Sequence, residues 1–289
     1  MNLLVLQTDF GLVDGAVSAM KGVAKQVHPK LEIFDLTHDI PQYDIWSASY
    51  RLIQTVNYWP KGTVFVSVVD PGVGSSRRSI ALETKDGHYV ITPDNGTISH
   101  LYHEENINRA FAIDEVKSRL PHSQESHTFH GRDIYAYNGA RLASGEVTVE
   151  ELGQEIEIES LIIDEIENPV VKGNTIHGKI DILDIRFGSL WSNIPLELLQ
   201  EQDIHRGDHI LVEILHHDQS VYQNILPFVR SFAEVTLGQP LVYVNSLVNL
   251  GVAVNQDSFS ALYHIGYGEE WNITIRKITK EQLALFNKE

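Results

Sequence analysis

Short apolar runs and stretches of helical periodicity alternate along the first part of the chain. Strands are predicted at residues 3–6, 31–36 and 63–69, because each is a brief run of apolar or β-branched residues. Helices are predicted between them, at 16–27 and 45–59, because apolar residues recur there every three or four positions. This β-α-β-α-β order predicts a mainly parallel sheet covered by helices.

Residues that start and stop helices support the same assignment. Asp14 and Asp44 stand where an N-terminal cap is expected, and Pro29 and Pro60 follow the two helical stretches. Further along, Asp86-Gly87 separates two strand-like runs and predicts a hairpin. A later helix is expected over residues 133–143, with Gly145 at its end.

The second part of the chain has a different pattern. Short alternating runs broken by Gly, Asn and Asp occur at 173–185, 209–215, 240–244, 251–255 and 271–275, with helical spacing only at 195–200 and in the tail. This pattern is typical of a small antiparallel barrel or sandwich. The predicted fold class is therefore α/β, with an amino-terminal mainly parallel sheet and flanking helices over residues 1–168. A carboxy-terminal antiparallel β-barrel-like domain is expected over 169–289, with the join near Asn168-Pro169.

Composition narrows the class of protein. The 289 residues are 43% hydrophobic, which excludes disorder for most of the chain, and a net charge of −17 opposes binding to nucleic acid or to an anionic membrane. With no Cys, any metal site would have to use His, Asp or Glu. No signal peptide or spanning segment is evident, so a cytoplasmic protein is expected.

Polar clusters follow the three early strands, at 8–14, 35–44 and 70–78. Ligands bind beyond the carboxyl ends of parallel strands, so these clusters are expected at one edge of the sheet. Taken singly, Asp9 and Asp14 are also typical turn or cap residues, and PDNG at 93–96 is a turn composition. TFHGRD at 128–133 more strongly indicates a catalytic or binding role, because it places a His, an Arg and free backbone N–H groups at a helix start.

Other polar features are assigned no catalytic role. The pairs His216-His217 and His100 with His103 resemble surface residues or weak metal pairs, and the acidic run over 150–167 is expected to be a solvated face. The P-loop pattern, GxGxxG and GxSxG are all missing from the sequence.

The motifs together are more specific than any one of them. TDFG with Asp14, THDIPQYD, DPGVG followed by Arg77, PDNG, TFHGRD, DIRFGSLWSNI and NSLVNLGVAVN occur in one order over nearly the whole chain. This combination resembles the S-adenosylmethionine (SAM) hydroxide adenosyltransferase family, the SAM hydrolases related to fluorinases and chlorinases. The resemblance implies an enzyme that converts SAM and water to adenosine and L-methionine, with SAM as substrate and no cofactor. It also implies a homotrimer in which SAM sits between the amino-terminal domain of one subunit and the carboxy-terminal domain of the next.

The resemblance also implies site residues. The family's catalytic triad falls on Asp70, Arg77 and His130, and Gly131 stands where the halogenating relatives have a Ser. Substrate contacts are implied for Asp9 at the ribose, Asp14 at the methionine ammonium, Tyr43 beside the sugar, Asp184, Phe187, Ser189 and Trp191 around adenine and methionine, Ser246 and Tyr243 near the methionine carboxylate, and the backbone of Asn255 and Gln256 at the adenine edge. Two positions depart from the family: Ser189 stands where Asn is frequent, and Leu247 stands where halogenases place an Arg for the carboxylate.

These residue types suit the reaction. The sulfonium is already a good leaving group, so the C5′–S bond can break by nucleophilic substitution once water is activated. His130 is the expected base, Asp70 can orient it or the water, and Arg77 can stabilise developing hydroxide. A dry cleft roofed by Phe10, Tyr43, Phe187 and Trp191 would strengthen the attraction between hydroxide and sulfonium.

Three alternatives remain at this point. A metal-dependent hydrolase could use Asp9, Asp35, His38, Asp70 and His130 as ligands. A non-catalytic module could bind SAM or adenosine without turnover. Halide-dependent transfer is the third, and Gly131 and Asp70 argue against it.

Overall fold

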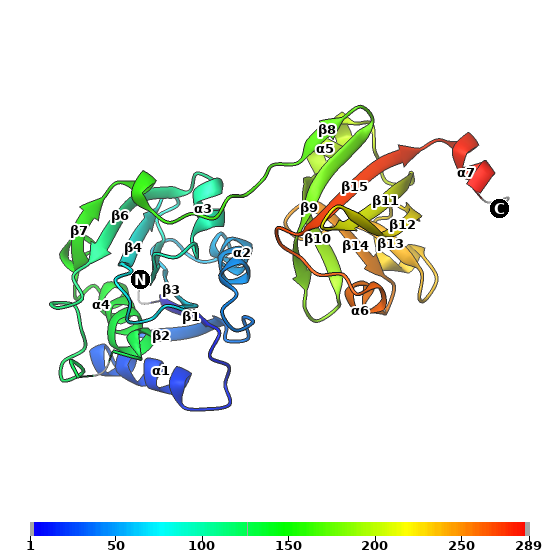
Figure 1. The fold of residues 1–289 in the computed structure, drawn as a ribbon. Coiled ribbons are helices and arrows are strands. Elements are labelled where there is room, and N and C mark those ends of the chain that lie inside the picture. Colours follow the sequence, from blue (N-terminus) through cyan, green and yellow to red (C-terminus); the bar gives the residue numbers. More distant parts are fainter. Residues whose placement is uncertain (1–2, 126, 287–289) are drawn as a thin grey trace. The chain divides into compact units, whose positions relative to one another are not determined.

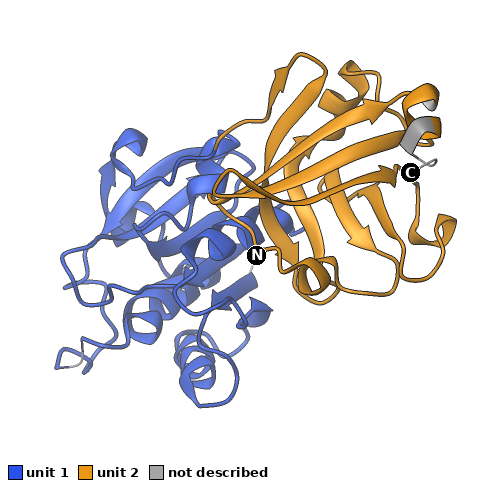
Figure 2. Cartoon of the chain, turned by 45° about the vertical axis from the view of Figure 1, so that its right-hand side comes forward, with its two compact units in different colours: residues 1–166 blue, residues 167–289 orange. Residues whose placement is uncertain are grey.

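A computed structural model describes residues 3–125 and 127–286 of the chain, which divide into two compact units, 1–166 and 167–289 (Figure 2). The division lies two residues before the predicted join. Each unit has its own hydrophobic core, the first between a sheet and its helices and the second inside a curved sheet. Within the described residues, no helix combines the length and apolar character needed to cross a bilayer.

The first unit begins with the predicted alternation of strands and helices (Figure 1). The elements are β1 (Leu3–Thr8), α1 (Ala16–Val27), β2 (Glu32–Thr37), α2 (Ile45–Val56) and β3 (Val64–Val68). Asp44 caps α2 as predicted, accepting a hydrogen bond from Ser47 N–H at 2.8 Å. At α1 the cap position is Gly15, and Asp14 instead accepts from Ala16 N–H at 2.9 Å. The helix α2 ends at Val56 rather than near residue 59, because tighter turn bonds follow it.

The sheet of the first unit is mixed. Its order is β2-β1-β3-β5-β4-β6-β7, with β4 (Ser79–Thr84), β5 (Tyr89–Pro93), β6 (Ile107–Ile113) and β7 (Gly153–Ile156). Strands β2, β1, β3 and β5 run parallel, whereas β4, β6 and β7 join by antiparallel pairing. The predicted hairpin around Asp86-Gly87 is confirmed as β4 and β5. Its antiparallel continuation is what makes the sheet mixed rather than mainly parallel.

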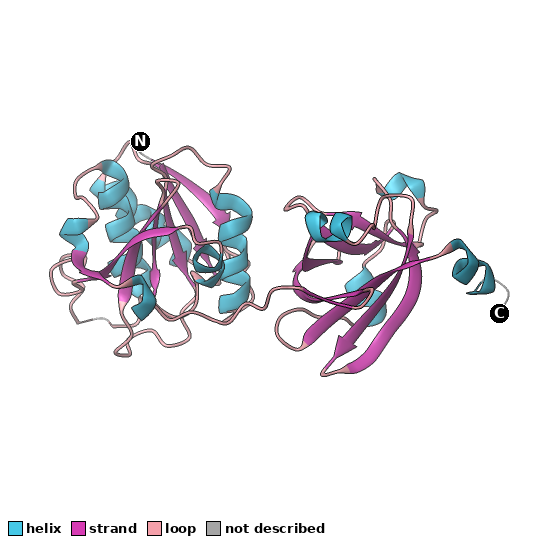
Figure 3. Ribbon diagram, turned by 90° about the horizontal axis from the view of Figure 1, so that it is seen from above, coloured by secondary structure: helices cyan, strands magenta, loops and turns pink. Residues whose placement is uncertain are grey.

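Helices cover both faces of this sheet (Figure 3). Leu4 and Leu6 of β1 pack with α1 and with α4 (Tyr137–Ser144), whereas Val5 between them packs on the side of α2. This alternation is the two-residue period of a strand buried on both faces. The α4 helix continues a π-helix, η1 (Gly131–Ala136), and ends at Gly145 in the left-handed region, as predicted.

The remaining elements of the first unit are short. They are α3 (Ser99–His103) and the 3₁₀ turns η2 (Glu150–Leu152) and η3 (Ile158–Ser160). The acidic run is more than a solvated face. Its edge strand β7 pairs with β6, and Glu150 and Glu155 both bind Arg109.

The second unit is an antiparallel, nearly closed barrel-like sheet. Its order is β12-β11-β15-β9-β10-β14-β13, with β8 added beside β9. The strands are β8 (Val170–Lys172), β9 (Thr175–Asp184), β10 (Ser189–Pro195), β11 (His209–His216), β12 (Gln219–Pro227), β13 (Pro240–Val244), β14 (Asn249–Val254) and β15 (Trp271–Ile278). A bridge between Phe228 and Val242 brings the two ends of the sheet together. The predicted fold class is therefore confirmed.

Short helices accompany this sheet. They are α5 (Leu196–Glu201), η4 (Phe232–Glu234), α6 (Phe259–Tyr263) and α7 (Lys280–Phe286). The predicted helices at 195–200 and in the tail correspond to α5 and α7. Hydrophobic pattern alone does not reveal β10 or β12, because polar residues occupy many of their positions.

Candidate functional site

The carboxyl ends of β1 and β3 lie side by side in the first unit. Thr8 at the end of β1 is in register with Val68 at the end of β3, so the clusters that begin with Asp9 and Asp70 share one edge. Strand β1 has β2 on one side and β3 on the other, which makes this edge a topological switch point where α/β sheets bind ligands. A cavity of 280 Å³ opens there, and its lining includes six predicted site residues: Asp9, Asp14, Tyr43, Asp70, His130 and Gly131.

Asp70 is held by its own loop. Its Oδ1 accepts hydrogen bonds from Gly72 N–H at 3.0 Å and from Nη1 of Arg77. A Cβ at position 72 would overlap the Arg77 guanidinium, so the glycine is what lets this side chain return to the carboxylate. Arg77 does not line the cavity itself and reaches the site through Asp70. The predicted Asp and Arg members of the triad are thus brought together.

His130 lies at the start of η1 and has a partner that no motif indicates. Its side chain is buried, and Arg119 Nη2 lies 3.1 Å from His130 Nε2. Since a guanidinium can only donate, Nε2 accepts this hydrogen bond and the neutral imidazole carries its proton on Nδ1. Arg119 Nη2 also forms an ion pair with Glu115 Oε2 at 3.8 Å. The other carboxylate oxygen of Glu115 accepts a hydrogen bond from the Ser79 hydroxyl at 2.6 Å.

The surroundings of His130 keep it neutral. Burial is the main cause that lowers its pKa below the usual 6.5, and the positive charge of Arg119 adds to that effect. Glu115 and Asp70 act in the opposite direction. The net result is an uncharged imidazole at neutral pH, with Nε2 engaged by Arg119.

The segments after β1 and β2 are tied to each other beside this cavity. Tyr43 N–H donates to Asp9 Oδ2 at 3.0 Å, and Gly11 N–H donates to the His38 carbonyl at 2.8 Å. Tyr43 holds a left-handed backbone, φ +67°, and its side chain is largely exposed. Asp9 and Tyr43, both expected around the sugar, are therefore direct neighbours.

Gly131 occupies a tight aromatic corner. A Cβ built at this position would lie 3.0 Å from Phe10 Cε2 and 3.4 Å from Phe129 Cε2. The two phenylalanines themselves meet edge to face, with ring centroids 6.0 Å apart. A side chain at position 131 would therefore have to displace Phe10 from the cavity wall.

The metal-hydrolase alternative finds no support in the described residues. His38 uses both ring nitrogens, with Thr8 Oγ1 at 2.8 Å and Asp35 Oδ1 at 3.0 Å. Asp70 is paired with Arg77, and no three of the five carboxylate and imidazole groups considered for that site approach at ligand spacing within residues 3–125 and 127–286. These groups serve hydrogen bonding and ion pairing in this arrangement.

The PDNG turn is structural, in agreement with its composition. Asn95 Nδ2 donates to the Val69 carbonyl at 2.8 Å, directly before Asp70. Asp94 accepts from Arg78 Nε at 2.9 Å. The turn therefore supports the backbone directly before the loop that carries Asp70 and Arg77.

A second cavity, of 1080 Å³, lies within the second unit. All eight residues predicted for this half line it: Asp184, Phe187, Ser189, Trp191, Tyr243, Ser246, Asn255 and Gln256. Trp191 Nε1 donates to the Tyr243 hydroxyl at 2.9 Å, and burial raises the pKa of that hydroxyl. The side-chain amide of Asn255 donates to the Val235 carbonyl at 2.9 Å, so its side chain is used within the fold.

Arg186 also lines this second cavity, and the sequence motifs do not single it out. It is the basic residue among the described lining residues, and it is exposed. Its position within DIRFGSLWSNI, between two predicted contact residues, is the signal that could have found it. The positive charge of Arg186 suits this cavity to a ligand that carries a carboxylate group.

Comparison with known proteins extends over both units. Residues 4–153 match the SAM hydroxide adenosyltransferase N-terminal domain, and residues 178–272 match the C-terminal domain. The chain is 32% identical to (R)-S-adenosyl-L-methionine hydrolase from Methanocaldococcus jannaschii, over 94% of this chain and 96% of the relative. It is 33% identical to the protein of the same name from Thermus thermophilus, over 87% and 91%. A fluorinase from Actinoplanes sp. is 26% identical over 94% and 97%.

A solved structure agrees with this relationship. The crystal structure of an uncharacterized conserved protein from Thermotoga maritima superposes with a TM-score of 0.85 at 30% identity, covering 95% of this chain and 100% of that one. The two domain matches occur in the order of the predicted domains and cover the predicted motifs. The chain belongs to the SAM hydroxide adenosyltransferase family.

Proposed function

We propose that this protein is an enzyme that hydrolyses SAM to adenosine and L-methionine. The observation that carries the proposal is the convergence of Asp70, with its partner Arg77, and His130 on one cavity beside Gly131. The relatives named (R)-S-adenosyl-L-methionine hydrolase, which align over most of the chain, support the same reaction. Their names further support the (R) sulfonium epimer as the substrate.

The chemistry requires one activated water. Its oxygen forms a bond to C5′ in line with the C5′–S bond, sulfur leaves with the electron pair as the thioether of methionine, and one proton is released. Hydroxide and sulfonium charges cancel at the reacting centre, so a site that excludes water favours the step. Correct alignment of the two reactants is worth up to roughly 7–11 kcal/mol of the barrier.

The geometry favours Asp70 as the group that accepts the proton. Because Nε2 of His130 accepts from Arg119, the imidazole can take a water proton there only after that hydrogen bond breaks. His130 then orients the water by donating from Nδ1, a role different from the base expected from sequence. The ion pair with Arg77 holds the Asp70 carboxylate at the cavity, and the positive charge of Arg77 acts on the developing hydroxide only through this carboxylate.

Contacts to the rest of the substrate follow from the two cavities. We assign the ribose hydroxyls to Asp9, the methionine ammonium to Asp14 and the aromatic wall to Tyr43, which all line the first cavity. The residues of the second cavity are assigned to adenine and methionine. Arg186 supplies the cation that Leu247 cannot offer to the methionine carboxylate.

A homotrimer is part of the proposal, with each SAM held by the first unit of one subunit and the second unit of another. The assigned residues divide between a cavity of the first unit and a cavity of the second, so the proposal requires both units to contribute to each site. Mixing D70N and W191A subunits tests it, since some mixed trimers would contain one intact site. Light scattering that reports a monomer, or mixtures no more active than the separate variants, would contradict it.

Turnover is tested directly with purified protein and each SAM epimer. Adenosine and methionine are followed by chromatography, with chloride, fluoride or a chelator added in separate reactions. The proposal requires adenosine above the enzyme-free control, without dependence on halide. Binding of SAM by calorimetry without adenosine release would favour a non-catalytic module, and loss of activity in chelator would favour a metal enzyme.

Variants divide the residues by role. D70N and H130A are expected to lower kcat more than they weaken SAM binding, because their groups act on the water. R186Q is expected to raise KM with little change in kcat, because the methionine carboxylate does not change during the reaction. Equal losses in both parameters for D70N would make Asp70 a binding residue.

A further inference from the structure

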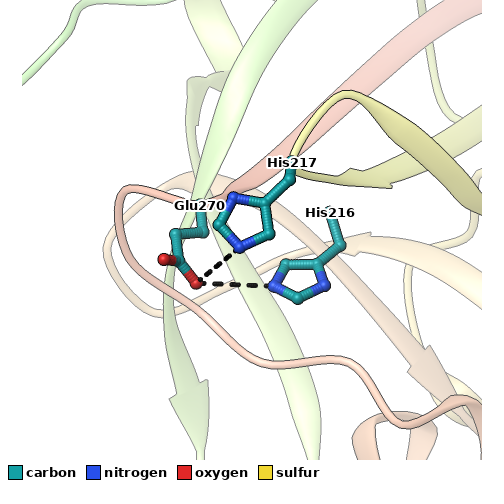
Figure 4. A group of neighbouring side chains, drawn as sticks. All are labelled: His216, His217 and Glu270. Carbon is teal, nitrogen blue, oxygen red and sulfur yellow. Dashed lines mark hydrogen bonds and ion pairs between the residues drawn. The ribbon is translucent and has the colours of Figure 1, made fainter.

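Two segments far apart in sequence meet at one end of the barrel-like sheet. His216 is the last residue of β11, and His217 and Asp218 form the two-residue turn into β12, with φ of +47° and +63°. Glu270 immediately precedes β15, and His216 is in register with Trp271 at the start of that strand. Figure 4 shows both imidazoles turned toward the Glu270 carboxylate.

The spacing of these groups matches that of metal ligands. Glu270 Oε2 lies 3.4 Å from His216 Nε2 and 3.3 Å from His217 Nε2. With bonds of about 2.0–2.1 Å, the ligand atoms of a tetrahedral zinc site lie about 3.3 Å apart. One ligand atom from each of the three residues lies within 4.8 Å of the others, and these are the described residues that form such a group.

Contacts outside the group hold its members in place. The His216 ring stacks on Trp271, with centroids 4.2 Å apart and planes 12° apart. His217 N–H donates to the Glu270 carbonyl at 3.1 Å, which fixes the turn against the segment before β15. Trp271 N–H donates to the Gly268 carbonyl at 3.1 Å and shapes that segment. The fold therefore already orders these side chains, which lowers the entropy cost of binding a cation.

We propose that His216, His217 and Glu270 bind one divalent transition-metal ion, with Zn²⁺ as the ion of choice. Two imidazoles and one carboxylate suit zinc, whereas Mg²⁺ and Ca²⁺ prefer oxygen ligands. The three side chains are between about one-third and two-thirds exposed, so water occupies the fourth position. The acidic chain, with Asp218 and Glu269 adjacent in sequence, favours a cation here.

The bound ion would cross-link the β11–β12 turn to the segment before β15. None of its ligands lines either of the two cavities assigned to SAM. The site therefore acts on the stability of the second unit and not on the chemistry at C5′. This inference does not depend on the proposed function.

Untagged protein, freed of metal with a chelator and dialysed, is the right material, because a histidine tag would bind the same ions. Calorimetric titration with ZnCl₂ is expected to give one site per chain, and Co²⁺ to give the visible absorption of a tetrahedral complex. H216Q, H217Q and E270Q should each weaken Zn²⁺ binding at least tenfold. The melting temperature should rise with Zn²⁺ in wild type and not in the triple variant.

The matched control is H205Q, which removes another exposed His from the same unit, one that pairs with Asp203. It should bind Zn²⁺ as wild type does. Melting in chelator verifies that each variant is folded. The proposal is overturned if wild type does not bind Zn²⁺, if the triple variant binds it equally well, or if H205Q loses as much affinity as H217Q.

Discussion

Arg119 donates a hydrogen bond to His130 across 3.1 Å, and both side chains are largely buried. This contact fixes which nitrogen of His130 carries the proton, and in the proposed mechanism it leaves the Nδ1 hydrogen for the attacking water. Arg119 acts through His130 and is therefore a positioning residue. Because the charge of Arg119 lowers the pKa of His130, a change at Arg119 should alter the pH dependence of kcat as well as its value.

R119M should lower kcat by about tenfold to a hundredfold, since a hydrogen bond from a charged donor is worth about 1.5–3 kcal/mol. The lost positive charge should also raise the pKa of His130, so the acid limb of kcat should move up toward pH 6.5. R119Q can still donate and should recover part of kcat. Stopped assays over a range of pH measure both effects.

E115Q provides the opposite shift. Glu115 raises the pKa of His130, so removing its charge should move the acid limb of kcat to lower pH. The amide can still accept from the Ser79 hydroxyl, which limits structural damage. Limbs that move in the same direction for R119M and E115Q would refute the electrostatic explanation.

G72A should separate Asp70 from Arg77. The added methyl group would overlap the guanidinium, so kcat should fall by about tenfold or more while SAM binding changes less. G22A is the matched control, because a Cβ there meets nothing within 4 Å and Ala favours the helix. Steady-state kinetics with calorimetric SAM affinity decide the outcome, and wild-type kcat in G72A would contradict the role given to the loop.

G131S should not convert the enzyme to a halogenase. The new Cβ would lie 3.0 Å from Phe10 Cε2, so Phe10 must shift and hydrolysis should fall severalfold. No chlorinated nucleoside is expected, since Asp70 remains at the site. Chromatography of products with and without chloride checks both points, with G22S as the control substitution. A chloride-dependent product would show that position 131 alone selects the nucleophile.

His100 should make the first unit sensitive to acid. Burial, followed by the nearby His103, lowers the pKa of His100 to about 3, and the ring packs edge-on against Trp46 and Tyr50. In the unfolded chain His100 takes up a proton near pH 6.5, whereas in the folded chain it stays neutral down to about pH 3. The free energy of unfolding is therefore unaffected by His100 above pH 6.5 and decreases as pH falls from 6.5 toward 3. Between pH 6.5 and 5 the loss is about 2 kcal/mol.

H100Q should remove that part of the pH dependence. Thermal melts at pH 7 and pH 5 should show a smaller drop for H100Q than for wild type, even if H100Q is less stable at pH 7. H205Q replaces an exposed imidazole and should keep the wild-type drop. Equal drops in H100Q and wild type would rule out His100 as the sensitive group.

The elements themselves could largely be read from sequence, because the signals that define them are local. The period of apolar residues predicted α1, α2 and β1 to β3, and Gly145 marked the end of α4. The end of α2 differs from the prediction because tighter turn hydrogen bonds follow Val56. Strands β10 and β12 are not predicted because polar residues interrupt their apolar pattern, at buried positions in β10 and mostly at exposed positions in β12. Each strand pairs with the one directly before it in sequence, and β10 also pairs with the distant β14.

The candidate site likewise contains residues that the sequence predicts and residues that it does not. The motifs select six of the residues that line the first cavity and eight of those that line the second. They could not reveal Arg119 as the partner of His130, because the two residues are 11 positions apart and no spacing rule for helices or strands applies. Nor could they bring Glu270 to His216 and His217, which are more than fifty positions earlier.

Most of the elements, the family and most of the candidate side chains can therefore be predicted from sequence, since periodicity, turn residues and motifs are encoded over a few positions. Three features emerge only in the folded chain: the mixed sheet, the hydrogen bond from Arg119 to Nε2 of His130, and the two histidines that face Glu270. Those features depend on strand order and on side-chain contacts between distant segments. They are fixed only when the whole core packs at once.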